Sequence, residues 1–169
     1  MRIPIVNEQD EVLYYKEREE TTRDEIRRII GLNVFNEKGE VLIAKRQSNK
    51  KIDPNLWGPS VAGTVDEGCD YDDTVVKEAE EEIGLKNIQP IFQRKSFYET
   101  TGARRFTSFY YVTIQMADHV FVLQEDEVAE IKWISVADLE NWFKEKPEDF
   151  IPSFQRTMNN IKEINENKN

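Results

Sequence analysis

Three glutamates in the middle of the chain have the residue type and the spacing to bind a metal ion. Glu81 and Glu82 follow Glu78 by three and four positions, which places all three carboxylates on one face of an α-helix. Like charges at this spacing repel one another, and a hard divalent cation with oxygen ligands would relieve the repulsion. The alternative is an acidic helix face in contact with solvent, because surface helices are rich in glutamate.

The residues on either side of the glutamates predict a helix with defined ends. Asp70 is a candidate N-cap with Asp73 as its capping-box partner, and Gly84 is a candidate C-terminal stop. The face opposite the glutamates is predicted to be buried and carries three apolar residues, Val76, Ala79 and Ile83.

The rest of the chain alternates between predicted strands and predicted helices. Short apolar runs predict strands at residues 3–6, 12–15, 26–35, 41–44, 88–99, 106–115 and 128–134. Apolar residues at helical spacing predict helices at residues 136–143 and from about residue 152 onward. Because strands and helices are interspersed, we expect an α+β fold, in which a mixed β-sheet is covered by helices on both faces.

Length and composition limit the classes of function. The chain has 169 residues, a formal net charge of −10 and one cysteine. An acidic chain is unsuited to nucleic acid over a broad face, no apolar run could span a membrane, and no intrachain disulfide can form. The first residues lack the features of a secretory signal, so we expect a cytoplasmic protein. A small phosphorylated ligand remains suitable, since Mg²⁺ can bridge phosphates to carboxylates.

The same length predicts one domain over residues 1–169. Its N-terminal part, at about residues 1–16, is expected to form a hairpin. Its polar C-terminal tail, at about residues 165–169, is expected to be frayed.

The spacing of residues 63–85 resembles the Nudix box, the sequence motif of the Nudix hydrolase family. In that motif a glycine is followed at fixed spacings by a glutamate, an arginine-glutamate pair, two adjacent glutamates and a second glycine. The positions that agree are Gly63, Glu78, Ala79, Glu81, Glu82, Gly84 and Leu85. Cys69 stands in place of the first glutamate, and Lys77 stands in place of the arginine. The resemblance covers nearly the whole chain and implies the α/β/α sandwich of this family.

The resemblance implies a Mg²⁺-dependent pyrophosphohydrolase that cleaves the diphosphate linkage of a small nucleoside diphosphate derivative by attack of water on phosphorus. Mg²⁺ or Mn²⁺ would be bound by Glu78, Glu81, Glu82 and the carbonyl of Gly63. Glu82 is the foremost candidate for catalysis. The general base that orients the water would be a box glutamate or one of three later carboxylates, Glu99, Glu127 and Glu130, for which a solvated surface position is the alternative. We expect a monomer or a homodimer.

The two departures from the motif, at Cys69 and Lys77, predict a less rigid site. In the family, the glutamate and the arginine at these positions brace the loop against the helix. A thiol and a lysine cannot form that charge-assisted pair. Because the metal ligands are retained, we expect weakened activity. The departures also favour an alternative function, a Nudix-fold module that binds or senses a diphosphate with little or no turnover.

Residues 45–63 and residues 146–154 resemble the subgroup of the family that contains the type I isopentenyl-diphosphate isomerases. Those isomerases carry a catalytic cysteine where this chain has Ala62, and a metal-binding histidine where it has Thr64. Isomerase activity is therefore kept only as a remote alternative.

Four residues are candidates to contact the substrate. By the isomerase resemblance, Arg46 and Lys50 would hold the diphosphate, and the alternative is that they are ordinary solvated residues of a basic loop. Trp57 and Tyr98 could stack on a nucleobase or line an apolar pocket. Burial in the core is the alternative for both.

Overall fold

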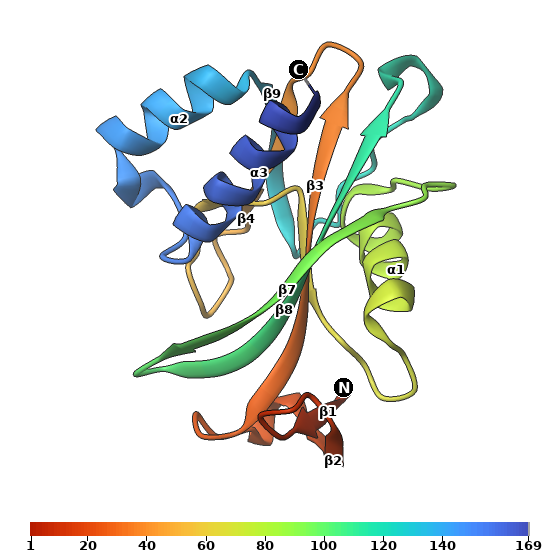
Figure 1. The fold of residues 1–169 in the computed structure, drawn as a ribbon, viewed down its shortest axis with the longest axis vertical. Helices are drawn as coiled ribbons and strands as arrows, with labels where there is room; N and C mark the ends of the chain where they lie inside the picture. The colour runs from red at the N-terminus through yellow and green to blue at the C-terminus, as the bar shows by residue number, and fades with distance from the viewer. Residues whose placement is uncertain (169) are drawn as a thin grey trace.

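The computed structural model describes residues 1–168, which form a mixed sheet with helices on both faces. The strands are β1 (Arg2–Val6), β2 (Val12–Glu17), β3 (Ile26–Asn36), β4 (Val41–Arg46), β5 (Trp57–Gly58), β6 (Val61–Thr64), β7 (Ile91–Thr100), β8 (Ala103–Ile114) and β9 (Val128–Ile134). The helices are α1 (Tyr71–Ile83), α2 (Val136–Glu145) and α3 (Phe154–Lys168). Figure 1 shows α1 on one side of the sheet and α2 and α3 on the other, which confirms the predicted α/β/α arrangement.

The central strand of the sheet is β3. It runs parallel to β8 over its whole length and antiparallel to β6 and β1. The hairpin predicted from residues 26–35 and 41–44 is present, but its strands pair only at Phe35 and Val41, next to the turn. Beyond that point β4 pairs with β5 and β9 instead. The main partner of β3 is therefore a strand far along the chain.

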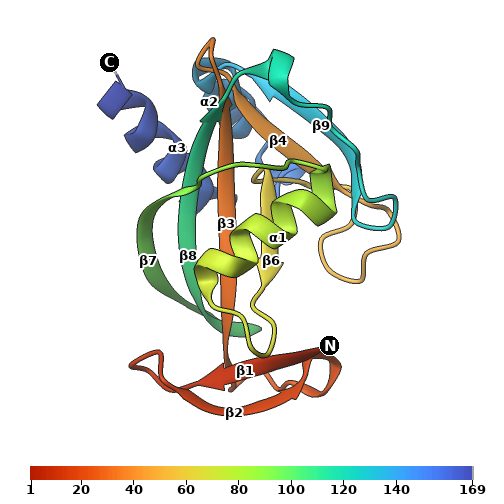
Figure 2. The same ribbon diagram turned by 90° about the vertical axis from the view of Figure 1, so that its right-hand side faces the viewer.

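Two apolar cores lie on opposite sides of the sheet. Ile30, Leu32 and Val34 pack with residues of α1, because alternate residues of a strand point to the same face. Phe35, on the other face, packs with residues of α2 and α3. Figure 2 shows α1 alongside β3 and β6, the strands that it covers.

The ends of α1 lie where the sequence predicts them. The Asp70 carboxylate accepts a hydrogen bond from the N–H of Asp73 at 2.8 Å. Gly84 has a φ of 71°, a left-handed conformation that glycine adopts without steric cost and that ends the helix.

The buried face of α1 differs from the prediction at one residue. Val76 is 39% exposed, whereas Val75 is buried and packs in the core with Ala79 and Ile83. These three buried residues follow one another at intervals of four, so they form one stripe, and Val76 lies about 100° further around the helix. The stripe therefore lies beside the glutamates, two of which become half-buried as a result.

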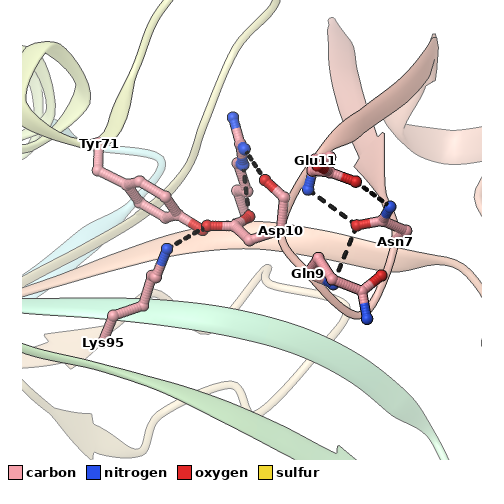
Figure 3. Close-up of polar contacts among 7 residues, drawn as sticks. Asn7, Gln9, Asp10, Glu11, Tyr71 and Lys95 are labelled. Atoms are coloured by element: carbon pink, nitrogen blue, oxygen red, sulfur yellow. Dashed lines mark hydrogen bonds and ion pairs between the residues drawn. The ribbon is translucent and has the colours of Figure 1, made fainter.

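The predicted N-terminal hairpin is formed by β1 and β2, and its turn is tied to the rest of the molecule at Asp10 (Figure 3). The side chain of Asp10 is 7% exposed. Its carboxylate accepts hydrogen bonds from Arg28 Nε at 2.8 Å, the Tyr71 hydroxyl at 3.1 Å and Lys95 Nζ at 2.5 Å. These donors belong to β3, to the first residue of α1 and to β7. The Asp10 carboxylate therefore ties the N-terminal hairpin to two strands and to the start of α1, the helix that carries the glutamates of the Nudix box.

The C-terminal residues differ from the prediction of a frayed tail. Residues 165–168 are helical because α3 continues to Lys168, and Asn169 lies outside the described residues. Among residues 1–168, no helix combines the length and the apolar character needed to cross a membrane.

Candidate active site

A cavity of about 370 Å³ lies beside α1, and charged side chains of both signs line it. Six acidic residues line it, namely Asp53, Asp66, Glu78, Glu81, Glu82 and Glu127, and all of these except Asp53 are called here the acidic group. The basic ones are Arg18, Arg27, Arg46, Lys50, Lys77, Arg105 and Arg156. Three of these, named here the arginine cluster, are Arg27, Arg105 and Arg156. The size suits a small ligand.

Gly63 and Glu78 lie in direct contact in this cavity. A Cβ atom on Gly63 would lie 2.4 Å from Cδ of Glu78, so any side chain at position 63 would displace the carboxylate. Gly63 belongs to β6, which pairs with β3 and packs against α1. The absence of a side chain lets the carboxylate rest on the main chain of β6. The contact brings together a carboxylate and a backbone segment, the two kinds of oxygen donor expected for the metal.

Burial and charge repulsion raise the pKa values of two box glutamates. Burial, and then repulsion from Glu81, raises the pKa of Glu78 to about 7. Burial, and then repulsion from Glu78, raises the pKa of Glu82 to about 8. This occurs although Oε2 of Glu82 accepts a hydrogen bond from the N–H of Ala62 at 3.3 Å. A cation among these carboxylates would favour their charged forms and reverse both shifts.

The donor set fits a hard divalent cation. Every candidate ligand is an oxygen, as Mg²⁺ requires, and Oδ1 of Asp66 is buried in the cavity lining without a hydrogen-bond partner. Within residues 1–168, no three His, Cys, Asp or Glu side chains are close enough together to hold a metal ion as they stand. A metal ion bound by three of these carboxylates would therefore require the side chains to move closer to one another.

The loop before α1 is braced by ion pairs other than the one the motif would supply. Lys77 forms an ion pair with Asp66, and this contact raises the pKa of Lys77. The motif's own pair cannot form between Cys69 and Lys77, and the lysine pairs instead with a carboxylate three residues before Cys69. Cys69 itself packs against the apolar core under α1. Glu67 adds a second brace, with its carboxylate 2.9 Å from Nη1 of Arg2.

Of the three candidate bases outside the box, Glu127 lines the cavity and the other two do not. Its charge contributes to the raised pKa values of both half-buried box glutamates. Its Oε2 atom lies 2.6 Å from Nζ of Lys50. Glu99 lies on β7 and forms an ion pair with Arg104 at 3.2 Å. Glu130 is an exposed residue of β9.

Of the four candidates for contact with the substrate, Arg46 and Lys50 line the cavity, whereas Trp57 and Tyr98 do not. Trp57 is 6% exposed and packs against another tryptophan in the core beside α2 and α3, so the alternative of core burial applies to it. The ring of Tyr98 lies under two guanidinium groups of the arginine cluster, at 4.7 Å and 4.5 Å from its centroid.

The arginine cluster is the part of the cavity that the sequence analysis missed. Arg27 on β3 and Arg105 on β8 are register partners, and Arg156 comes from α3. The local signal is strand alternation, which places residues 27, 29 and 31 on one face of β3 and residues 105, 107 and 109 on one face of β8; all six line the cavity, as does Ile30. That signal becomes useful only once the parallel pairing of β3 with β8 is known.

Comparisons with known proteins give a consistent family. A model of the NUDIX domain matches residues 24–154. An uncharacterized Nudix hydrolase of Listeria monocytogenes is 31% identical over 133 residues, which cover 77% of this chain and 75% of that protein. An isopentenyl-diphosphate Delta-isomerase of Shigella flexneri is 29% identical over 122 residues, 70% of this chain and 67% of that one.

A solved structure agrees with the fold. The NUDIX domain of NrtR from Shewanella oneidensis, in complex with ADP-ribose, superposes with a TM-score of 0.65 and 17% identity, over 88% of this chain and 92% of that one. The residues that match the family model contain β3, β6 and α1, and so include Gly63 and the glutamates that line the cavity. On this evidence the chain belongs to the Nudix family and is a Nudix hydrolase.

Proposed function

We propose that this Nudix hydrolase is a Mg²⁺-dependent pyrophosphohydrolase that cleaves the diphosphate linkage of a small nucleoside diphosphate derivative. The observation that carries the proposal is the contact of Glu78 with Gly63, in a cavity that Glu81 and Glu82 also line. ADP-ribose, which the NrtR domain binds, belongs to the same class of compound. Mn²⁺ would suit the same oxygen ligands.

Three parts of the box would hold the metal: Glu78, Glu82 and the main chain of Gly63. The bound ion would supply charge neutralisation at phosphorus and a more acidic water. Because Glu82 is half-buried, its ionised carboxylate would attract a cation more strongly than a fully exposed carboxylate would. Glu81, which is exposed at the cavity, remains a candidate for a further ligand.

Lys50 and Glu127 would act as a pair that exchanges partners. Without substrate, the ammonium group lies 2.6 Å from the carboxylate. A diphosphate oxygen of the substrate would compete with Glu127 for the ammonium group of Lys50. The guanidinium group of Arg46 would bind the diphosphate as well. Glu127 would then be free to accept a hydrogen bond from the attacking water and orient it as general base.

Isomerisation of a prenyl diphosphate is less well supported. It requires groups that deliver and remove protons at carbon. Ala62 and Thr64 both line the cavity, and neither a methyl group nor an alcohol is an effective general acid or base at neutral pH. Hydrolysis needs only a positioned water and neutralised phosphate charges. The acidic group with its bound metal ion, together with Arg46 and Lys50, can supply both.

The test is hydrolysis of a panel of nucleotide sugars, dinucleotides and nucleoside triphosphates with Mg²⁺, measured by product separation. The Glu82→Gln variant should lower kcat/KM by roughly a thousand-fold, because the neutral amide cannot replace a charged metal ligand. Glu80→Gln is the matched control, since Glu80 is an exposed residue of the same helix and pairs with Lys86 at 3.1 Å. Activity that survives in Glu82→Gln, or no product from any member of the panel, would overturn the proposal.

A further inference from the structure

The arginine cluster gathers three cations from distant parts of the chain. Arg27 and Arg105 stand opposite each other on β3 and β8. Arg156 of α3 donates a hydrogen bond to the hydroxyl of Ser96 and lies over the ring of Tyr98, as does Arg105. Strand pairing and helix packing hold all three guanidinium groups at one cavity.

These guanidinium groups lack the carboxylate partners that five other arginines, at positions 2, 23, 28, 94 and 104, have. Among residues 1–168, no carboxylate lies within ion-pair distance of any member of the arginine cluster. The Nε atoms of Arg27 and Arg105 are buried without a hydrogen-bond partner. The neighbouring residues on each strand differ in having carboxylate partners, because Arg28 is 2.8 Å from Asp10 and Arg104 is 2.9 Å from Glu8, although Nε of Arg104 is also buried without a hydrogen-bond partner.

The arrangement is costly without an anion. Burial lowers the pKa of Arg27 and of Arg105, and the charge of Arg105 lowers the pKa of Arg27 further, against a smaller opposite effect on the two pKa values from the charges of Glu25 and Asp53. Buried donors without acceptors and neighbouring like charges both disfavour the folded state. Thr107, two positions after Arg105 on the same face of β8, also has a buried hydroxyl without a partner. Guanidinium and hydroxyl donors that converge on a cavity match the oxygens of a phosphoryl group.

We propose that the arginine cluster binds a phosphoryl group of the substrate that is separate from the diphosphate cleaved at the acidic group. This rests on the proposed function. The substrate class is thereby narrowed to nucleoside diphosphate derivatives that carry a further phosphate on their organic part.

The separation of the two sites supports a second phosphoryl group. Gly63 is the register partner of Ile30, and Arg27 precedes Ile30 by three residues, which corresponds to about 10 Å along β3. The strand register thus places the arginine cluster and the box glutamates at different points along β3. Tyr98 is unsuited to stack on a base here, because two guanidinium groups already lie over its ring.

The first experiment measures binding of inorganic phosphate to metal-free protein in EDTA by titration calorimetry. Wild-type protein should bind phosphate saturably, and Arg105→Gln should weaken the affinity at least about tenfold, since a charged hydrogen-bond donor is lost. Arg104→Gln is the matched control, because Arg104 is the adjacent residue and is absent from the cavity lining; it should bind as the wild type does. Arg156→Gln, on another element, should repeat the loss if Arg105→Gln folds poorly.

The second experiment compares hydrolysis of ADP with hydrolysis of adenosine 3′-phosphate 5′-diphosphate. Wild-type protein should prefer the further-phosphorylated compound by about tenfold in kcat/KM, and Arg105→Gln should remove the preference. Phosphate binding that is absent, or equal in wild type and both cluster variants, would overturn the inference. If binding depends on Arg105 but no diphosphate is hydrolysed, the anion site stands and the proposed function fails.

Discussion

The acidic group and the arginine cluster line one cavity but are assembled in different ways. Glu78, Glu81 and Glu82 come from little more than one turn of α1. Arg27, Arg105 and Arg156 come from two strands and a helix. The first set is recognisable from local spacing, whereas the second exists only because β3 pairs with β8 and α3 packs beside them. The difference shows that one part of a binding site can be specified by residues close together in the sequence, while another part forms only when distant segments pack together.

The two sets also differ in how their charges are balanced. Two carboxylates of the acidic group have basic partners, since Lys77 pairs with Asp66 and Lys50 pairs with Glu127. Within the described residues the arginine cluster has no such ion pair, and its contacts are with aromatic rings and a serine hydroxyl. We infer that the acidic group is suited to bind a cation and that the arginine cluster is suited to bind an anion.

After the loss expected for Glu82→Gln, the largest effect is expected from Gly63→Ala on the acidic side. The new Cβ would lie 2.4 Å from Cδ of Glu78, so the carboxylate must leave its position and kcat/KM should fall by about a hundredfold. Gly102→Ala is the control, because a Cβ on Gly102 meets no atom within 4 Å. Steady-state kinetics with Mg²⁺ would measure both; equal activity of the two variants would show that the Gly63 contact is unimportant.

A smaller effect, on stability, should separate neighbouring arginines of β3. Arg28→Gln should lower the free energy of unfolding by about 2 kcal/mol, because it removes the 2.8 Å partner of the buried Asp10 carboxylate. Arg27→Gln should leave it unchanged or raise it, since Arg27 has no ion pair to lose, has a buried donor without a partner and is repelled by Arg105. Urea denaturation without phosphate gives both values. Equal losses would mean that Arg27 has a stabilising partner in solution.

The next effect is on the pH dependence of stability. The folded-state pKa values of Glu78 and Glu82, about 7 and about 8, lie above the ordinary value of 4.5. Their protonated forms favour folding, so in EDTA this stability is fully present below about pH 4.5 and is lost as the pH rises through about 7 to 8. Mg²⁺ should raise Tm more at about pH 9 than at about pH 6, because proton release accompanies binding. Thermal denaturation measures both, and Glu82→Gln should flatten the dependence.

The smallest effect is expected from restoring the motif with Cys69→Glu and Lys77→Arg together. Because Lys77 already pairs with Asp66, a second carboxylate should alter kcat/KM by less than about threefold, in line with the small contribution of exposed ion pairs. Lys77→Arg alone serves as the control. A large gain in activity in the double variant would contradict the bracing role of Asp66 and favour the alternative of a binding module with a weakened box.

Several details of the site could not be predicted from the sequence, because they depend on packing between distant segments. Glu99, Glu127 and Glu130 are alike as residues, and only the packing of the segment before β9 places Glu127 at the cavity. Trp57 is equally suited to stacking or burial, and the packing of α2 against β5 decides for burial. Val76 was expected in the core because apolar residues at neighbouring helix positions cannot be separated by type alone.

The sequence by itself determined the box helix, its caps at Asp70 and Gly84, and the spacing of its glutamates. Helix hydrogen bonds and capping contacts join residues that are only a few positions apart, so local order specifies them. Only the tertiary structure decided that Lys77 pairs with Asp66, that Glu127 lies at the cavity, and that an arginine cluster forms. Pairing between distant strands depends on the packing of the whole sheet, which no short stretch of sequence encodes.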